Sequence, residues 1–159
     1  MPHSTQSPSL ATEDNSRDDF IIVSSPNVAE KARLGWVQVA PTVNALPTTG
    51  YNAQNFGGGE RCWEAMCLIY PCLRIRTISA EGEGVVFLYG RGHGRDPEPP
   101  RVGDDDGLQI MIPLSIEGTV RMNGAEVKLN EYYHILKRCT LEIPPGSRLV
   151  VYLVYNIML

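Results

Sequence analysis

Apolar residues alternate along one segment near the middle of this chain. They occupy every second position: Leu108, Ile110, Ile112, Leu114 and Ile116. Side chains two residues apart lie on the same face of a β-strand, so the pattern predicts a strand with one apolar face. Pro113, on the other face, has no N–H to donate to a neighbouring strand. Pro113 therefore predicts that this segment is either an edge strand or a bulged strand.

Asn123-Gly124 predicts a tight hairpin turn, since both residues tolerate the positive φ that such a turn requires. The turn would pair Val120–Met122 with Ala125–Val127. In that register apolar residues face apolar residues, and Arg121 faces Glu126. Cross-strand pairs of these kinds stabilise a sheet by a few tenths of a kcal/mol to about 1 kcal/mol each.

The C-terminal segment Leu149–Leu159 contains one strongly polar residue, Asn156. An exposed edge strand of this composition would aggregate, which favours a central strand. We expect its alternate residues to lie in the core or in a subunit interface. They are Val151, Leu153, Tyr155, Ile157 and Leu159.

Short apolar runs and turn residues recur at intervals of about eight to twelve residues, without the alternation of strands and helices that marks a parallel sheet. The sequence therefore predicts an all-β domain over residues 20–159, a two-sheet antiparallel sandwich of jelly-roll type. One short helix is expected, capped by Ser25 and ending at Gly35. Trp36–Val39 would follow as a strand, and 40–59 as a loop.

Residues 1–19 have almost nothing to bury and carry one basic and four acidic side chains, a net charge of −3. This composition predicts a disordered acidic tail. The whole chain has a net charge of −4. Both values make nucleic-acid binding through the tail an unfavourable hypothesis. No signal sequence or membrane-spanning run is recognisable, so we expect a cytoplasmic protein without a membrane partner.

Three consecutive carboxylates, Asp104, Asp105 and Asp106, follow Glu98 in a polar loop. Clustered carboxylate oxygens are ligands that calcium prefers, so the three aspartates are candidate calcium ligands. The alternative is a solvated loop without a cofactor, because short charge runs usually face water.

Ile143-Pro144-Pro145-Gly146-Ser147-Arg148 resembles the Pro-x-Gly turn of the second cupin motif, with Leu149 where that motif has a metal-binding histidine. His93 and Glu98 resemble part of the first motif. The resemblance implies a metal-dependent enzyme or a small-molecule binder built around the barrel interior. Its candidate site residues are His93, Glu98 and Asp104.

The dense strands, the long polar tail and the apolar C-terminus together resemble single-jelly-roll coat proteins of small viruses. This resemblance implies a non-enzymatic structural protein that self-assembles into a homo-oligomer and contacts other structural proteins in a virion. The acidic tail implies a minor or decorating component. A β-domain that binds another protein stays a third possibility.

Overall fold

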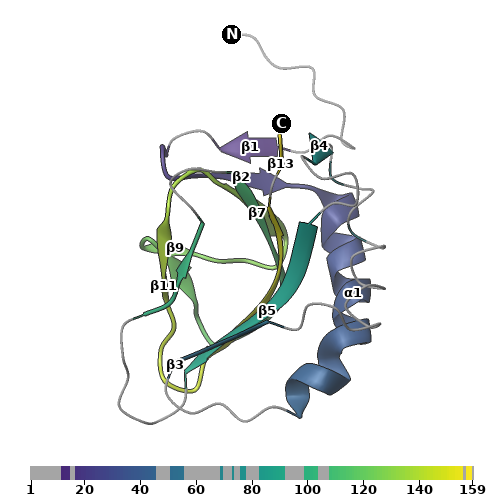
Figure 1. Cartoon of the computed structure of the whole chain (residues 1–159), viewed down its shortest axis with the longest axis vertical. Helices are drawn as coiled ribbons and strands as arrows, with labels where there is room; N and C mark the ends of the chain where they lie inside the picture. The colour runs from purple at the N-terminus through teal and green to yellow at the C-terminus, as the bar shows by residue number, and fades with distance from the viewer. Residues whose placement is uncertain are drawn as a thin grey trace, which may run out of the picture.

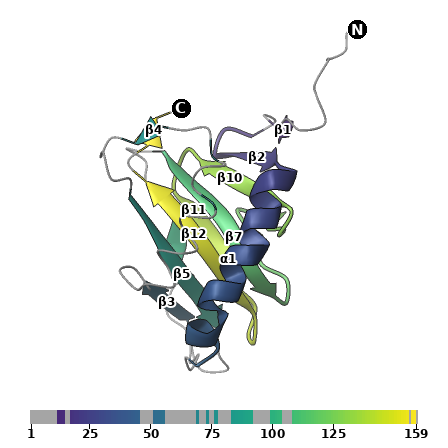
Figure 2. The same ribbon diagram turned by 90° about the vertical axis from the view of Figure 1, so that its right-hand side faces the viewer.

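The computed structural model of the chain (Figure 1) describes residues 12–14, 17–45, 51–55, 69, 73, 76–77, 83–91, 99–103, 108–155 and 157–158. Within these ranges two antiparallel sheets face each other and one helix covers the outer face of the larger sheet (Figures 1 and 2). The predicted two-sheet antiparallel sandwich is therefore confirmed.

The larger sheet has seven strands, in which β12 is flanked by β7 and β5. Its order is β1 (Thr12–Asp14), β2 (Phe20–Ser24), β10 (Glu131–Ile135), β7 (Gln109–Glu117), β12 (Arg148–Tyr155), β5 (Glu83–Arg91) and β3 (Tyr51–Asn55). The smaller sheet has the order β6 (Arg101–Val102), β11 (Cys139–Glu142), β8 (Arg121–Met122) and β9 (Ala125–Glu126). A separate pair joins β4 (Arg76–Thr77) to β13 (Ile157–Met158).

The strands β5 to β12 pair in a nested pattern. The first, β5, pairs with the last, β12. Inside that pair, β6 pairs with β11 and β7 pairs with β10. The innermost pair is β8 with β9, joined by the predicted hairpin turn, in which Asn123 and Gly124 have φ of 48° and 85°. Its predicted register is confirmed, with Arg121 opposite Glu126.

Strand β12 is central, as predicted, and its alternate residues lie in two cores. Val150, Tyr152 and Val154 belong to a helix-side core between the larger sheet and the helix. Leu149 and Val151 belong to an inter-sheet core between the two sheets, together with Leu153. A strand buried on both faces reads as a continuous apolar run, which explains the composition of this segment.

Strand β7 is not an edge strand, because β10 and β12 flank it. It is bulged at the predicted proline: Val150 faces Ser115 and Val151 faces Pro113, which leaves Leu114 without a partner on β12. The extra residue reverses the alternation beyond it. Ile116 therefore packs on the inter-sheet core, and the prediction that it shares a face with Ile110 is wrong.

Helix α1 (Pro26–Asn44) is longer than the predicted short helix. Its start is as predicted: the Val28 N–H donates to Ser25 Oγ at 3.4 Å and Pro26 occupies the first turn. It continues through Gly35 and the expected strand Trp36–Val39. The buried face holds Val28, Ala32, Gly35, Val39 and Val43, a stripe at helical spacing. Burial of Val39 and Val43 offsets the cost of an internal glycine.

The prediction of a loop over 40–59 is wrong in two places. Helix α1 extends to Asn44, and Tyr51–Asn55 form β3, which pairs with β5.

The predicted turn before β12 is confirmed: the Ser147 N–H donates to the Pro144 carbonyl at 2.9 Å, and Gly146 has a φ of 81°. This combination is that of a type II turn.

Candidate functional site

Among the described residues, a cluster of polar side chains joins the segment before β2 to the turn between β8 and β9. Asp19 accepts two hydrogen bonds from the Arg17 guanidinium, at 2.9 and 2.8 Å. It also accepts one at 2.9 Å from the side-chain nitrogen of Asn123, 104 residues away in the sequence. The Arg17 guanidinium further donates to the Asn123 carbonyl at 3.0 Å. We call Arg17, Asp19 and Asn123 the polar hub.

Asn123 uses four polar groups in this arrangement. Besides the two bonds above, its N–H donates to the Thr140 carbonyl at 3.0 Å, and its side-chain oxygen accepts from the Thr140 N–H at 2.8 Å. The left-handed φ of Asn123 turns the side chain back toward β11. Asparagine fits because it tolerates that conformation and offers both a donor and an acceptor.

The electrostatics of the polar hub favour an ionised Asp19. The hydrogen bond from Arg17, followed by that from Asn123, holds the pKa of Asp19 well below its ordinary 3.8 against the opposing effect of burial. The same pairing raises the pKa of Arg17. Charge-assisted and bidentate bonds of this kind are the stronger hydrogen bonds of proteins.

The polar hub also closes one side of the inter-sheet core. The Arg17 guanidinium lies 4.4 Å from the centre of the Phe20 ring, and Phe20 is fully buried. The Asp19 carbonyl accepts from the N–H groups of Leu136 and Lys137, at 2.9 and 3.2 Å. The domain was predicted to begin at residue 20. Arg17 and Asp19 precede that boundary and nevertheless form hydrogen bonds with the domain.

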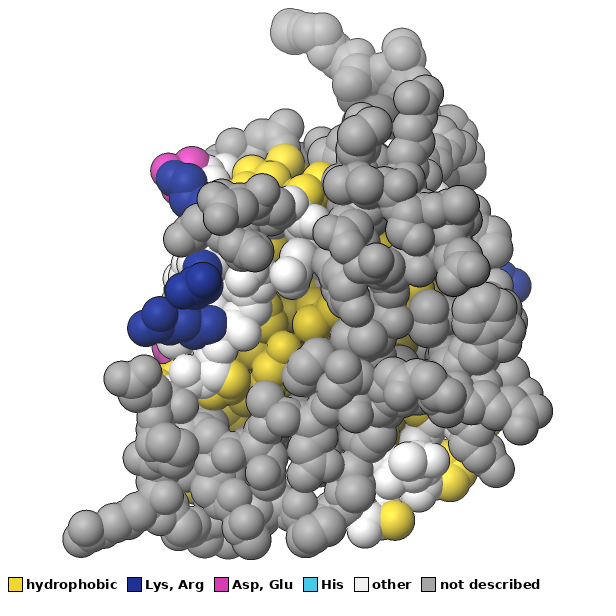
Figure 3. Space-filling view, viewed as in Figure 1, with side chains coloured by type: hydrophobic (Ala, Val, Ile, Leu, Met, Phe, Trp, Pro, Cys, Tyr) yellow, Lys and Arg dark blue, Asp and Glu magenta, His cyan; other side chains and the backbone are white. Residues whose placement is uncertain are grey.

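The space between the two sheets is filled with apolar side chains among the described residues. Its largest buried members include Phe20, Met111, Met122, Tyr133 and Leu141. Figure 3 shows hydrophobic side chains at the centre of the molecule in the same view as Figure 1, with Lys and Arg to their left. The Tyr133 hydroxyl accepts from the Lys128 N–H at 2.8 Å, so its polar end is satisfied at the margin of this core.

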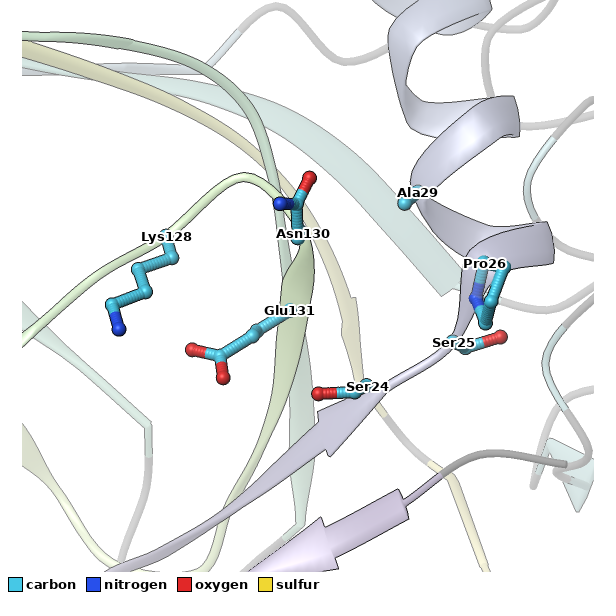
Figure 4. A pocket seen from close by; sticks show the side chains of 7 residues that line it. All are labelled: Ser24, Ser25, Pro26, Ala29, Lys128, Asn130 and Glu131. Atoms are coloured by element: carbon cyan, nitrogen blue, oxygen red, sulfur yellow. The ribbon is translucent and has the colours of Figure 1, made fainter. Parts of the chain in front are cut away.

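A shallow pocket of about 550 Å³ lies beside the N-terminus of α1. Its lining is Ser24, Ser25, Pro26, Ala29, Lys128, Asn130 and Glu131. Figure 4 shows that the charged ends of Lys128 and Glu131 extend away from the helix. The lining has charges of both signs that do not converge on one point, so it is a surface hollow rather than a formed binding site.

Two of the predicted interface residues have described side chains. Val151 is fully buried and Leu153 is 5% exposed, both in the inter-sheet core of this chain. Tyr155 ends β12, Ile157 begins β13 opposite Thr77, and the side chains of both lie outside the described residues, as does all of Leu159. Of the two locations expected for these residues, core or interface, Val151 and Leu153 lie in the core of this chain.

The predicted calcium and enzyme sites lie outside the described residues: His93, Glu98, Asp104, Asp105 and Asp106. Within the described ranges no group of three His, Cys, Asp or Glu side chains could hold a metal ion. Cys139 forms no disulfide and is fully buried. Burial raises the pKa of its thiol to about 11. Such a thiol is a poor nucleophile near neutral pH.

Sequence reasoning missed the polar hub, because Asp19 and Asn123 are brought together by the fold alone. The one local signal was Asn123-Gly124, which predicted the turn without its partners. No described helix is long and apolar enough to cross a membrane. Comparison with protein-family models and with curated proteins finds no match to this chain.

Proposed function

We propose that this chain is a single-jelly-roll structural protein that self-assembles, as a capsid, minor capsid or decorating component of a virion. The observation that carries the proposal is the nested pairing of β5 to β12: first with last, second with seventh, third with sixth, fourth with fifth. Two Greek keys folded together produce this order, which is the pattern of jelly rolls in viral shells.

The inter-sheet core favours a structural role over ligand binding. A small-molecule site needs a cavity with converging polar groups. Among the described residues the inter-sheet space instead holds close-packed apolar side chains such as Met111, Met122 and Val151. A sandwich filled in this way is a rigid building block whose partners contact its outer surface.

The C-terminal segment is the proposed contact with a second copy. Val151 and Leu153 fix β12 in the core, and β13 continues beyond it to pair with β4. Tyr155 ends β12, Ile157 begins β13 and Leu159 is the last residue of the sequence, and the apolar character of all three favours burial between subunits. Other structural proteins are the further proposed partners. Assembly would place a protein made in the cytoplasm in the virion.

Two parts of the proposal concern charge. The acidic tail disfavours contact with a packaged genome, which supports an outer or decorating position. Asp104, Asp105 and Asp106 are the proposed ligands for calcium at a subunit contact, because three adjacent carboxylates repel each other until a cation neutralises them.

The alternative is a cupin-like metal-dependent enzyme or small-molecule binder that uses His93, Glu98 and Asp104. The nested strand order favours it as well, because cupins have jelly-roll domains. The two functions differ in whether the protein holds a stoichiometric transition metal.

The test is the mass of the protein in solution by light scattering, with a metal assay on the same samples. Full-length protein is compared with a version truncated after Tyr155, each with calcium and with a chelator. Arg33→Ala, on the exposed face of α1, is the matched control. We expect an oligomer that truncation dissociates, that Arg33→Ala leaves intact, and that contains no transition metal.

Circular dichroism shows whether the truncated chain keeps its fold. A full-length monomer at high concentration would refute assembly. A monomer with one bound transition metal would establish the enzyme alternative. An oligomer indifferent to truncation would refute the C-terminal contact alone.

A further inference from the structure

We infer that the segment before β2 is a releasable strap, held to the domain by the polar hub with Asn123 as its attachment point. The strap comprises β1 and Arg17–Asp19. Strand β1 pairs with Ile22–Ser24 along the outer edge of β2, while β10 occupies the inner edge. Attachment of the strap therefore decides whether the outer edge of β2 is covered.

Before Phe20 the strap has two backbone attachments besides the polar hub: β1 pairs with β2, and the Asp19 carbonyl accepts from the N–H groups of Leu136 and Lys137. Of its described side chains, Asp18 is 89% exposed and pairs with Lys137 at 3.4 Å, a contact too exposed to contribute much. Arg17 and Asp19 are 33% and 17% exposed. Because Arg17–Asp19 bury no large apolar side chain, polar contacts hold this part of the strap, and the bonds with Asn123 join its Arg17 and Asp19 side chains to the turn between β8 and β9.

Asn123 is itself held to the smaller sheet. Both its N–H and its side-chain oxygen bond to Thr140 on the smaller sheet. Only its carbonyl and its side-chain nitrogen face the strap, toward Arg17 and Asp19. A change confined to that nitrogen therefore acts on the strap and leaves the bonds to Thr140 in place.

Asn123→Asp makes this change with almost no change in shape. It replaces the nitrogen 2.9 Å from the Asp19 carboxylate with a second carboxylate oxygen. Two carboxylates at that separation repel each other, so the strap opens more often at neutral pH. The oxygen that accepts from the Thr140 N–H is retained.

Trypsin reports the opening directly in the full-length chain. Arg17 is the one cleavage site before Lys31, and its side chain must leave Asp19 to enter the protease. Cleavage of an open form that recloses quickly follows the population of that form. We expect Asn123→Asp to accelerate cleavage after Arg17 on the order of tenfold.

Two further variants separate attachment from general damage. Asn130→Asp adds the same charge at an exposed position of a neighbouring turn, and we expect the wild-type rate. In the double variant Asp19→Asn, Asn123→Asp, the side-chain nitrogen at position 19 can donate to the carboxylate at position 123. This restores the hydrogen bond with donor and acceptor exchanged. We expect it to be cleaved more slowly than Asn123→Asp alone.

The inference fails if Asn123→Asp is cleaved at the wild-type rate, if Asn130→Asp is cleaved as fast, or if the double variant shows no rescue. Cuts throughout the chain in Asn123→Asp would mean global unfolding. Asp19→Asn then takes its place, and a wild-type rate at Arg17 in that variant overturns the inference. Cleavage is measured on the chain alone, so the result does not depend on assembly.

Discussion

The guanidinium of Arg148 lies 2.8 Å from a carboxylate oxygen of Glu117, its opposite residue in the pairing of β12 with β7. The same guanidinium donates to the Asn44 side chain at 3.0 Å and lies 5.9 Å from the centre of the Trp36 ring. Arg148 therefore joins the last turn of α1 to the larger sheet, at the end of the helix that the sequence failed to predict.

Arg148→Ala should lower the free energy of unfolding by about 1–2 kcal/mol, because it removes two hydrogen bonds and a cation–π contact from a side chain that is only 14% exposed. Chemical denaturation measures the change. Arg33→Ala removes an exposed ion pair with Glu30 within α1 and serves as the control, with no measurable loss expected. Equal stability of Arg148→Ala and wild type would show that the junction does not stabilise the helix.

Gly103→Ala should destabilise the domain by about 3 kcal/mol, through backbone strain together with overpacking. Gly103 has a φ of 88°, and an added Cβ would meet the Cγ2 atom of the fully buried Ile135 and lie 2.9 Å from the Lys137 carbonyl. Gly124→Ala is the matched control, with a similar φ of 85° and open space around the added atom. It should cost about 1–2 kcal/mol, from backbone strain alone.

The melting temperatures of the two glycine variants isolate the steric contribution. A large difference between them confirms that the chain at Gly103 packs closely against the β10–β11 connection. Equal losses would mean that the backbone moves to accommodate the methyl group, and that close approach is not what requires glycine there.

Val151→Ala should reduce the free energy of unfolding by about 2–3 kcal/mol, through lost apolar burial and a residual cavity in the inter-sheet core. The loss should be independent of protein concentration, because Val151 is buried within one chain. Val37→Ala, at a valine that is 60% exposed, should change stability by less than about 0.5 kcal/mol. A concentration-dependent loss at Val151 would instead indicate an interface residue.

How far the sequence predicted this fold depended on whether each feature is local. Asn123-Gly124 specified its turn and register, because the residues that pair are adjacent to it. The end of α1 was missed because Gly35 and Pro41 are weak helix residues, although Val39 and Val43 continue the buried stripe past both. Tertiary burial overrides propensity in such cases.

The candidate site was predicted less well than the fold, for the same reason. Pro113 indicated an edge strand or a bulge, but the residue left without a partner, Leu114, follows from the way β12 pairs with β7. No pattern within β7 therefore shows that Ile116 changes face. The bond between Asp19 and Asn123 joins residues 104 positions apart. The sequence does not show which distant residue a charged or amide side chain will bond to. Apolar alternation, in contrast, predicts that a residue is buried without requiring its partner to be known.

Acidification should weaken the domain through Asp19. The folded state holds the pKa of this carboxyl below its ordinary 3.8, so Asp19 contributes stability that is present above that value and is lost as the pH falls through the folded pKa. The free energy of unfolding, measured by chemical denaturation from about pH 7 to about pH 3, should therefore decline below about pH 4.

Asp19→Asn should be less stable than wild type at neutral pH, and the difference in free energy of unfolding should narrow on acidification. Asp18→Asn, which removes an 89% exposed carboxylate, controls for charge alone. If Asp19→Asn and wild type kept the same difference at every pH, the ion pair with Arg17 would not be what ties Asp19 to the folded state.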